Sequence, residues 1–237
     1  MAWQVTDPGG KHEQMLVLPR VQPADAAALA YWRQSMGSAS RLKHPHLAAV
    51  VESGVQDGWP FVLHELGDAA TLADRLPPHG LSGREAAALA AQCLQGLAYA
   101  HEAGLAHHDL QPFLMLLDER GRLRVAGLAV AQEMATADDP MRASQTLDAA
   151  ALRSRRLAAE QDVLACGIVL QALLTGLPAL PHADILQVLL NLPPQGREPM
   201  RLPWTLAQPI AEPLRAIVNR ATDRQPRLRY RSARTLL

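Results

Sequence analysis

The sequence predicts an α+β fold in which a small β-rich lobe precedes a larger helical lobe. Short apolar runs separated by turn residues, a pattern typical of strands, dominate residues 1–66. From residue 67 onward, apolar residues recur at three- and four-residue steps, which indicates amphipathic helices. A length of 237 residues is compatible with two such lobes sharing a cleft. We therefore expect residues 1–66 and 67–237 to form the two lobes.

Four strand-like runs and one helical pattern make up the first lobe. The strands are expected at residues 3–6, 14–18, 46–55 and 58–66. Gly9-Gly10, between the first two runs, indicates an ordinary hairpin turn. The helix is expected at residues 24–42. It ends before His44-Pro45 because the residue that precedes a proline disfavours helical backbone angles.

Helices dominate the second lobe. The first begins at Ser82, which forms a capping-box pattern with Glu85, and it ends at Gly104. Two apolar runs with a turn between them indicate a hairpin over residues 113–128. Further helices are expected at residues 162–176, 182–190 and 210–223. Residues 132–161 are Ala-rich and mixed in charge, and we interpret them as a loop.

Composition and charge narrow the classes of partner and the compartment. Acidic and basic side chains balance at 23 each, which does not favour a nucleic-acid or anionic-membrane partner. No apolar run approaches the roughly 18–20 residues that cross a bilayer, and no signal segment opens the chain. Cys93 and Cys166 lie in apolar helical patterns, so we expect two buried free thiols in a reducing compartment. Together these features predict a cytoplasmic protein.

Four fragments, in matching order and spacing, resemble parts of the bacterial Ser/Thr protein kinases. They are residues 41–66, 96–112, 162–178 and 219–233. The resemblance covers nearly all of the chain and implies a two-lobe protein kinase-like fold. The aminoglycoside- and choline-kinase group shares a His-x-Asp-x-x-Pro loop, but the last two fragments argue against that group. The helical pattern that reaches the last residue favours one module of a longer protein.

In the first lobe, the resemblance implies nucleotide-binding parts that this sequence lacks. No glycine-rich phosphate loop is present. Pro19 and Arg20 occupy the place of the lysine that holds the phosphates, and the place of its glutamate partner falls near Ser35. A planar guanidinium is not equivalent to a compact ammonium group. His64 occupies the gatekeeper position.

In the second lobe, the resemblance implies a catalytic loop that has lost its metal ligands. Asp109 matches the general base and His107 the structural histidine. In the loop itself, His108 replaces the family's arginine and Gln111 replaces its lysine. Leu114 replaces the metal-binding asparagine, and the Asp-Phe-Gly triplet is replaced by Gly127, Leu128 and Ala129. Because Mg²⁺ requires oxygen ligands, we expect no metal at this site.

Two further residues have structural roles by resemblance. Asp162 begins the central helix of the second lobe, and Arg229 matches the arginine that normally pairs with the glutamate of an Ala-Pro-Glu motif. Residues 157–160 echo that motif only weakly, so the pairing of Glu160 with Arg229 is left open. Asp109, without lysine or metal, is expected to accept hydrogen bonds from loop amides.

We interpret the sequence as a pseudokinase, a kinase-like domain that binds a protein partner or regulates a fused signalling domain. No cofactor is expected. The alternatives are a weak or atypical Ser/Thr kinase that uses ATP and Mg²⁺ through Asp109, and an ATP sensor without phosphoryl transfer, for which Arg20 would supply charge. Arg153, Arg155 and Arg156 form a basic cluster that is either a solvated loop or a partner-docking site.

Overall fold

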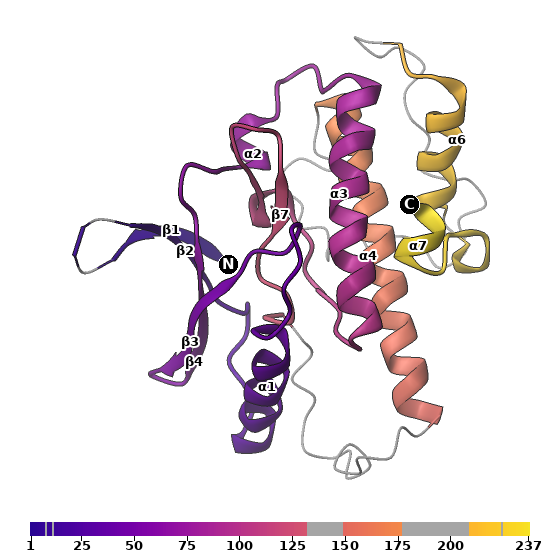
Figure 1. Ribbon diagram of the computed structural model, residues 1–237. Coiled ribbons are helices and arrows are strands. Elements are labelled where there is room, and N and C mark those ends of the chain that lie inside the picture. The colour runs from indigo at the N-terminus through magenta and orange to yellow at the C-terminus, as the bar shows by residue number, and fades with distance from the viewer. Residues whose placement is uncertain (8, 11, 132–148, 177–208, 224) are drawn as a thin grey trace.

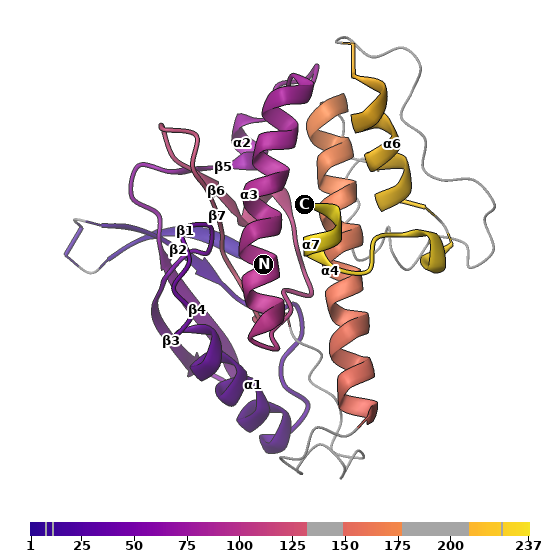
Figure 2. The same ribbon diagram turned by 45° about the vertical axis from the view of Figure 1, so that its right-hand side comes forward.

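The computed structural model confirms the α+β class, with a β-sheet lobe and a helical lobe (Figures 1 and 2). The structure describes residues 1–7, 9–10, 12–131, 149–176, 209–223 and 225–237. The expected helix at residues 182–190 therefore lies outside the described residues. The division of the chain after residue 66 stays a prediction.

The first lobe contains an antiparallel sheet with the strand order β1-β2-β4-β3. Its strands are β1 (Ala2–Thr6), β2 (Glu13–Val17), β3 (Val50–Gln56) and β4 (Trp59–Glu65), and all four confirm the predicted runs. Gly10 lies in the β1–β2 turn with a φ of 66°. Asp57 and Gly58 both have positive φ, which matches the twist of the β3–β4 hairpin.

One helix, α1 (Ala26–Ala39), belongs to the same lobe and confirms the predicted helical pattern. Its N-cap is Asp25, whose side chain accepts a hydrogen bond from the backbone N–H of Ala28 at 2.8 Å. The buried face of α1 carries Trp32, Ser35 and Met36. Ser35 therefore lies on the inner side of this helix, without offering the carboxylate that the resemblance implies.

The helical lobe is built around two long helices, α3 (Gly83–Glu102) and α4 (Ala149–Thr175), which lie side by side. The predicted capping box is present at the start of α3. The remaining helical segments are α2 (Leu72–Arg75), α6 (Glu212–Ala221), α7 (Ala233–Leu236) and the 3₁₀ turns η1 (Pro112–Leu114) and η3 (Pro226–Leu228). A small sheet of β5 (Ala70–Thr71), β6 (Met115–Leu117) and β7 (Leu123–Val125) faces the cleft side.

The interpretation of residues 132–161 as a loop is wrong for its last part. Residues 149–161 belong to α4, which runs without interruption for 27 residues. Alanine, leucine, arginine and glutamate, the residues with the highest helix propensities, fill most of this stretch, and it contains neither glycine nor proline. The helix propensity of this stretch is thus a better guide than its mixed charge.

The expectation that no segment has the length and apolarity of a membrane span also needs correction. Residues Leu152–Thr175 of α4 are long enough and contain an 18-residue window with a mean hydropathy of 1.5. However, 72% of that window is buried inside the protein, where α4 packs against α3, α6 and α7. A core helix of a globular domain has the same composition as a spanning helix, and burial identifies α4 as the former.

Candidate functional site

The loop that carries the candidate catalytic residues is anchored by Asp162 of α4. This carboxylate is 1% exposed and accepts hydrogen bonds from the backbone N–H groups of His107 and His108, at 2.7 and 2.9 Å. The ring Nε2 of His101, on α3, lies 2.9 Å from the same carboxylate. Burial works to raise the pKa of Asp162, but the hydrogen bond from His101 and the neighbouring histidine charges bring it below its usual value.

The ring of His107 joins the loop to the strand that ends beside it. Its Nε2 lies 2.8 Å from the carbonyl oxygen of Ala126, and its Nδ1 accepts a hydrogen bond from the N–H of Asp109 at 3.3 Å. These two contacts require the neutral tautomer with the proton on Nε2. His108 adopts a φ of 68°, a left-handed conformation that turns the chain between its two neighbours.

Asp109 is held by an arginine from the other lobe. Nε and Nη2 of Arg20 donate to the two carboxylate oxygens of Asp109, at 3.1 and 3.0 Å. Nε2 of Gln111 donates to Oδ1 of the same carboxylate at 3.1 Å. The side chain of Asp109 is 4% exposed and that of Arg20 is 35% exposed. The two lobes are thus joined by a bidentate ion pair, the strongest form of such a contact.

This geometry corrects the expectation that the carboxylate of Asp109 would bind loop amides. The loop amides donate to Asp162 instead, and Asp109 turns toward Arg20 and Gln111. The physical reason is the position of Arg20, just beyond the end of β2, from which a long side chain reaches across to the loop. The sequence separation of 89 residues leaves no local signal for this pair.

The residue of β2 that lies near position 127 is Val17 rather than Arg20. The buried residues of β2 are Met15 and Val17. A Cβ atom on Gly127 would lie 3.4 Å from Cγ1 of Val17 and 3.5 Å from the methyl groups of Leu114. The side chain that faces position 127 from β2 is therefore Val17, while Arg20 is committed to Asp109.

The positions that would hold a metal are apolar and closely packed. Leu114, Leu128 and Ala129 are buried, and Gly127 and Ala129 have φ values of 80° and 62°. Leu114 and Val17 fill the space toward which a side chain at position 127 would extend. Within the described ranges, no three His, Cys, Asp or Glu side chains form a group that could hold a metal ion.

His64, which the resemblance puts at the gatekeeper position, is hydrogen-bonded to the same segment. Its Nε2 accepts a hydrogen bond from the N–H of Gly127 at 3.0 Å, and its Nδ1 lies 3.0 Å from the carbonyl oxygen of Ala49. The ring is 2% exposed, and burial lowers the pKa of His64 to about 4. His64 is therefore neutral and carries its proton on Nδ1. Sequence reasoning identified the position but not this contact.

A cavity of about 380 Å³ lies between the β-sheet lobe and the segment that leads into α2. Its lining is Ala2, Trp3, Gln4, Met15, Leu66, Ala69, Ala70, Thr71, Ala73, Asp74 and Phe113. This lining contains no lysine or arginine, and its one carboxylate belongs to Asp74, which accepts from the hydroxyl of Thr71 at 2.6 Å. The cavity offers a surface for a flat apolar group but no cation for phosphates.

Arg229 and Glu160 lie close enough to interact through their charges. Burial lowers the pKa of Arg229, and the carboxylates of Asp223 and Glu160 oppose that change. Nε of Arg229 also donates to the carbonyl oxygen of Asp223. Glu160 approaches Arg229 from within the helix α4, rather than from a loop as the resemblance implied.

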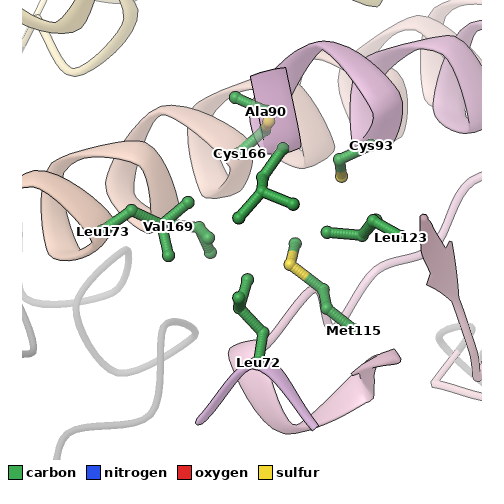
Figure 3. Close-up of a pocket in the computed structure, with 9 residues that line it drawn as sticks. Leu72, Ala90, Cys93, Met115, Leu123, Cys166, Val169 and Leu173 are labelled. Carbon is green, nitrogen blue, oxygen red and sulfur yellow. The ribbon is translucent and has the colours of Figure 1, made fainter. Parts of the chain in front are cut away.

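A second, smaller void lies inside the helical lobe, between α3, α4 and the small sheet (Figure 3). It is lined by apolar side chains and by the thiols of Cys93 and Cys166, and it has no room for a water-sized molecule. Both cysteines are free and buried, which confirms the expectation for them. The hydrogen bond with Cys166, together with burial, raises the pKa of Cys93, so Cys93 is an unreactive core residue.

Known proteins were compared with the chain at the levels of family, sequence and structure. The family model described as "protein kinase domain" matches residues 26–237, so the match begins at the first residue of α1 and leaves out β1, β2 and Arg20. The serine/threonine-protein kinase PrkC of Bacillus subtilis is 26% identical over 209 residues, which cover 85% of this chain and 32% of PrkC. PknB of Mycobacterium tuberculosis is 24% identical over 214 residues, which cover 85% of this chain and 34% of PknB.

The likeness extends to solved structures. The crystal structure of the Mycobacterium tuberculosis PknI kinase domain aligns with a TM-score of 0.67 at 23% identity, over 99% of this chain and 87% of that one. At this identity the alignment is evidence for the fold alone. The chain spans about a third of the length of the curated relatives PrkC and PknB.

Proposed function

The chain belongs to the protein kinase family, and from this premise we propose that it is a catalytically inactive kinase-like domain that acts as a protein-binding or regulatory module in bacterial signalling. It would work in the cytoplasm with a protein partner or a fused signalling domain, and would need neither ATP nor Mg²⁺. Nucleic acids and membranes are not among the proposed partners.

The observation that carries this proposal is the state of Asp109. A general base must reach the proton that it removes from a substrate hydroxyl, at a heavy-atom distance of about 2.6–3.2 Å. Here Oδ1 accepts hydrogen bonds from Arg20 and Gln111, and Oδ2 accepts one from Arg20. A carboxylate that is 4% exposed and bound in this way is a structural partner of Arg20, not a free base.

The apolar metal positions support the same proposal. Phosphoryl transfer depends on positioning and on neutralising the charge of the phosphates, which metal ions and a lysine provide. Leu114, Gly127 and Val17 offer no side-chain oxygen or nitrogen for either role. Removing one preorganised electrostatic group typically lowers a rate by about 10²- to 10³-fold. The effects of several losses are not additive, but together they oppose turnover.

Two alternatives also have observations in their favour. A weak Ser/Thr kinase is favoured by the relatives, which are Ser/Thr protein kinases, and by the aspartate at position 109. An ATP sensor without phosphoryl transfer is favoured by the cavity of about 380 Å³ between β1, β2 and α2. Because its lining lacks a basic side chain, such a site would bind the base more strongly than the phosphates.

One experiment separates the three. The chain is melted with millimolar ATP, with and without Mg²⁺, and is assayed for transfer of labelled phosphate to itself and to a generic Ser/Thr protein substrate. A ligand at about 100 times its Kd adds about 2.7 kcal/mol to the free energy of unfolding, which raises the melting temperature of a protein of this size by several degrees. We expect no shift and no transfer above the level of Asp109→Ala.

Other outcomes contradict the proposal in distinguishable ways. Stabilisation by ATP that does not depend on Mg²⁺ would identify a sensor. Phosphate transfer that disappears in Asp109→Ala would identify an enzyme. The second result would also require the Arg20–Asp109 pair to open during turnover.

A further inference from the structure

The N-terminal part of α4 extends beyond the body of the protein. Residues 152–157, the α4 extension, are exposed at every position, whereas residues 158–160 are half-buried and Asp162 is buried. In both views the end of α4 runs past the end of α3 (Figures 1 and 2). Six consecutive exposed residues exceed one helical turn, so every face of the α4 extension has surface in contact with solvent.

Two leucines on the α4 extension expose apolar surface. Leu152 is 46% exposed and Leu157 is 60% exposed. Neither belongs to the buried core of the lobe. The exposed part of each leucine is therefore available to another molecule.

Three arginines accompany the leucines. Arg153, Arg155 and Arg156 are all exposed, and the first carboxylate along α4 is Glu160. Arg153 and Arg156 are three residues apart, so their like charges lie on neighbouring turns and repel each other. This local arrangement is unfavourable for an isolated helix and becomes favourable when anionic groups lie against it.

The helical geometry puts the leucines and two of the arginines on one face. With about 100° per residue, Leu152, Arg156, Arg153 and Leu157 follow one another in that order within about 140°. Arg155 lies outside this face, and its guanidinium packs near Gly104, at the turn before the catalytic loop. The shared face therefore has a basic centre with an apolar residue at each side.

We propose that this face of the α4 extension docks an acidic amphipathic segment of a protein partner. Carboxylates of the partner would bind Arg153 and Arg156, and its apolar side chains would cover Leu152 and Leu157. The proposal deepens the proposed function, because it rests on the domain being a protein-binding module and names the chemistry of the partner. It does not depend on the state of the nucleotide cleft.

The test uses the whole chain and a fluorescein-labelled peptide in which pairs of glutamates alternate with leucines. Binding is followed by fluorescence anisotropy at about 50 mM and about 300 mM salt, because exposed ion pairs weaken with ionic strength. We expect saturable, salt-sensitive binding. Arg153→Glu/Arg156→Glu should weaken it by about ten-fold or more, and Arg153→Gln/Arg156→Gln serves as a milder version of the same change.

Matched controls separate docking from general charge attraction. Arg33→Glu/Arg84→Glu makes the same change in net charge at exposed arginines of α1 and α3, and should alter the affinity less than about two-fold. Leu157→Ala, which keeps a strong helix former, should weaken binding by about five-fold. A peptide with serine in place of each leucine should show a similar loss.

Four results would overturn the proposal. The first is peptide binding that does not saturate at about 1 mM, and the second is an equal loss of peptide affinity in Arg33→Glu/Arg84→Glu. The third is a peptide affinity that Leu157→Ala leaves unchanged. The fourth is tighter binding of duplex DNA or anionic phosphatidylserine vesicles than of the peptide through the same arginines. The failure of either proposal can be recognised separately. Phosphate transfer would refute the inactive domain while leaving peptide docking intact, and loss of docking without phosphate transfer would refute only the docking site.

Discussion

Replacing Arg20 should destabilise the protein more than replacing Asp109, although the two residues form one ion pair. The side chain of Asp109 is 4% exposed and that of Arg20 is 35% exposed. After Arg20→Ala, a buried carboxylate keeps only the amide of Gln111 as its described side-chain partner. After Asp109→Asn, the guanidinium can turn into water and keep part of its hydration. The asymmetry follows from the cost of leaving a charge buried and unpaired.

The expected magnitudes lie between those of exposed and buried pairs. Exposed pairs contribute about 0–1 kcal/mol, and breaking a buried pair costs about 3–5 kcal/mol. Because a third of the Arg20 side chain is in solvent, we expect Arg20→Ala to lower the free energy of unfolding by about 2–3 kcal/mol, and Asp109→Asn by about 1 kcal/mol. The double variant should lose about 2 kcal/mol, which gives a coupling energy of about 1–2 kcal/mol.

Urea denaturation of the two single variants, the double variant and the parent measures this cycle. Arg33→Ala, at an exposed position of α1, controls for the loss of an arginine without a buried partner and should change stability by less than about 0.5 kcal/mol. Equal losses in Arg20→Ala and Asp109→Asn, or a coupling energy below about 0.5 kcal/mol, would refute the reasoning. The claim that Arg20 holds the base position would then lose its energetic support.

Three further predictions concern the residues around this pair. His64 has a folded-state pKa of about 4, below the ordinary value of 6.5, so the unfolded state binds more protons between these pH values. The free energy of unfolding should therefore fall as the pH drops from about 6.5 to about 4. His64→Gln should flatten this dependence in urea denaturation at a series of pH values, and an unchanged slope would contradict the prediction. Asp162→Asn should lower the free energy of unfolding in urea by about 2–4 kcal/mol, because the carboxylate accepts hydrogen bonds from two loop amides and faces His101. A loss below about 1 kcal/mol would show that the loop has other anchors. Gly127→Asp should destabilise the fold by about 3 kcal/mol because it buries a carboxylate between Val17 and Leu114. Adding Val17→Lys to this variant should recover part of the lost stability in thermal melts. A double variant no more stable than Gly127→Asp would contradict the facing positions of residues 17 and 127.

The elements of the fold that could be predicted from the sequence are those with local signals. The capping box of Ser82 and Glu85 begins α3, and Asp57-Gly58 turns the hairpin between β3 and β4. The start of α4 was not predicted because residues 132–161, Ala-rich and mixed in charge, were interpreted as a loop, although strong helix formers fill most of residues 149–161. Propensity is the better guide in a segment without glycine or proline.

The contacts of the candidate site could not be predicted in the same way. Arg20 and Asp109 are 89 residues apart, and His64 and Gly127 are 63 residues apart. No periodicity or spacing links such residues, because their contact depends on how the two lobes meet. The residue types could be aligned with the family, but alignment did not show that the arginine binds the base position and that Val17 faces position 127.

The missing metal ligands and the Arg20–Asp109 pair are physically linked. A buried carboxylate needs a cation or several donors nearby. Leu114 and Gly127 offer no oxygen ligand, and Arg20 places a positive charge beside the carboxylate of Asp109. Asparagine at position 114 or aspartate at position 127 alone would therefore add a polar group to an apolar site, while Arg20 still bound Asp109. On the proposal that the domain is inactive, a gain of catalysis would require metal ligands at both positions, a lysine at position 17 and the removal of Arg20 together. Each partial combination should be less stable than the parent protein.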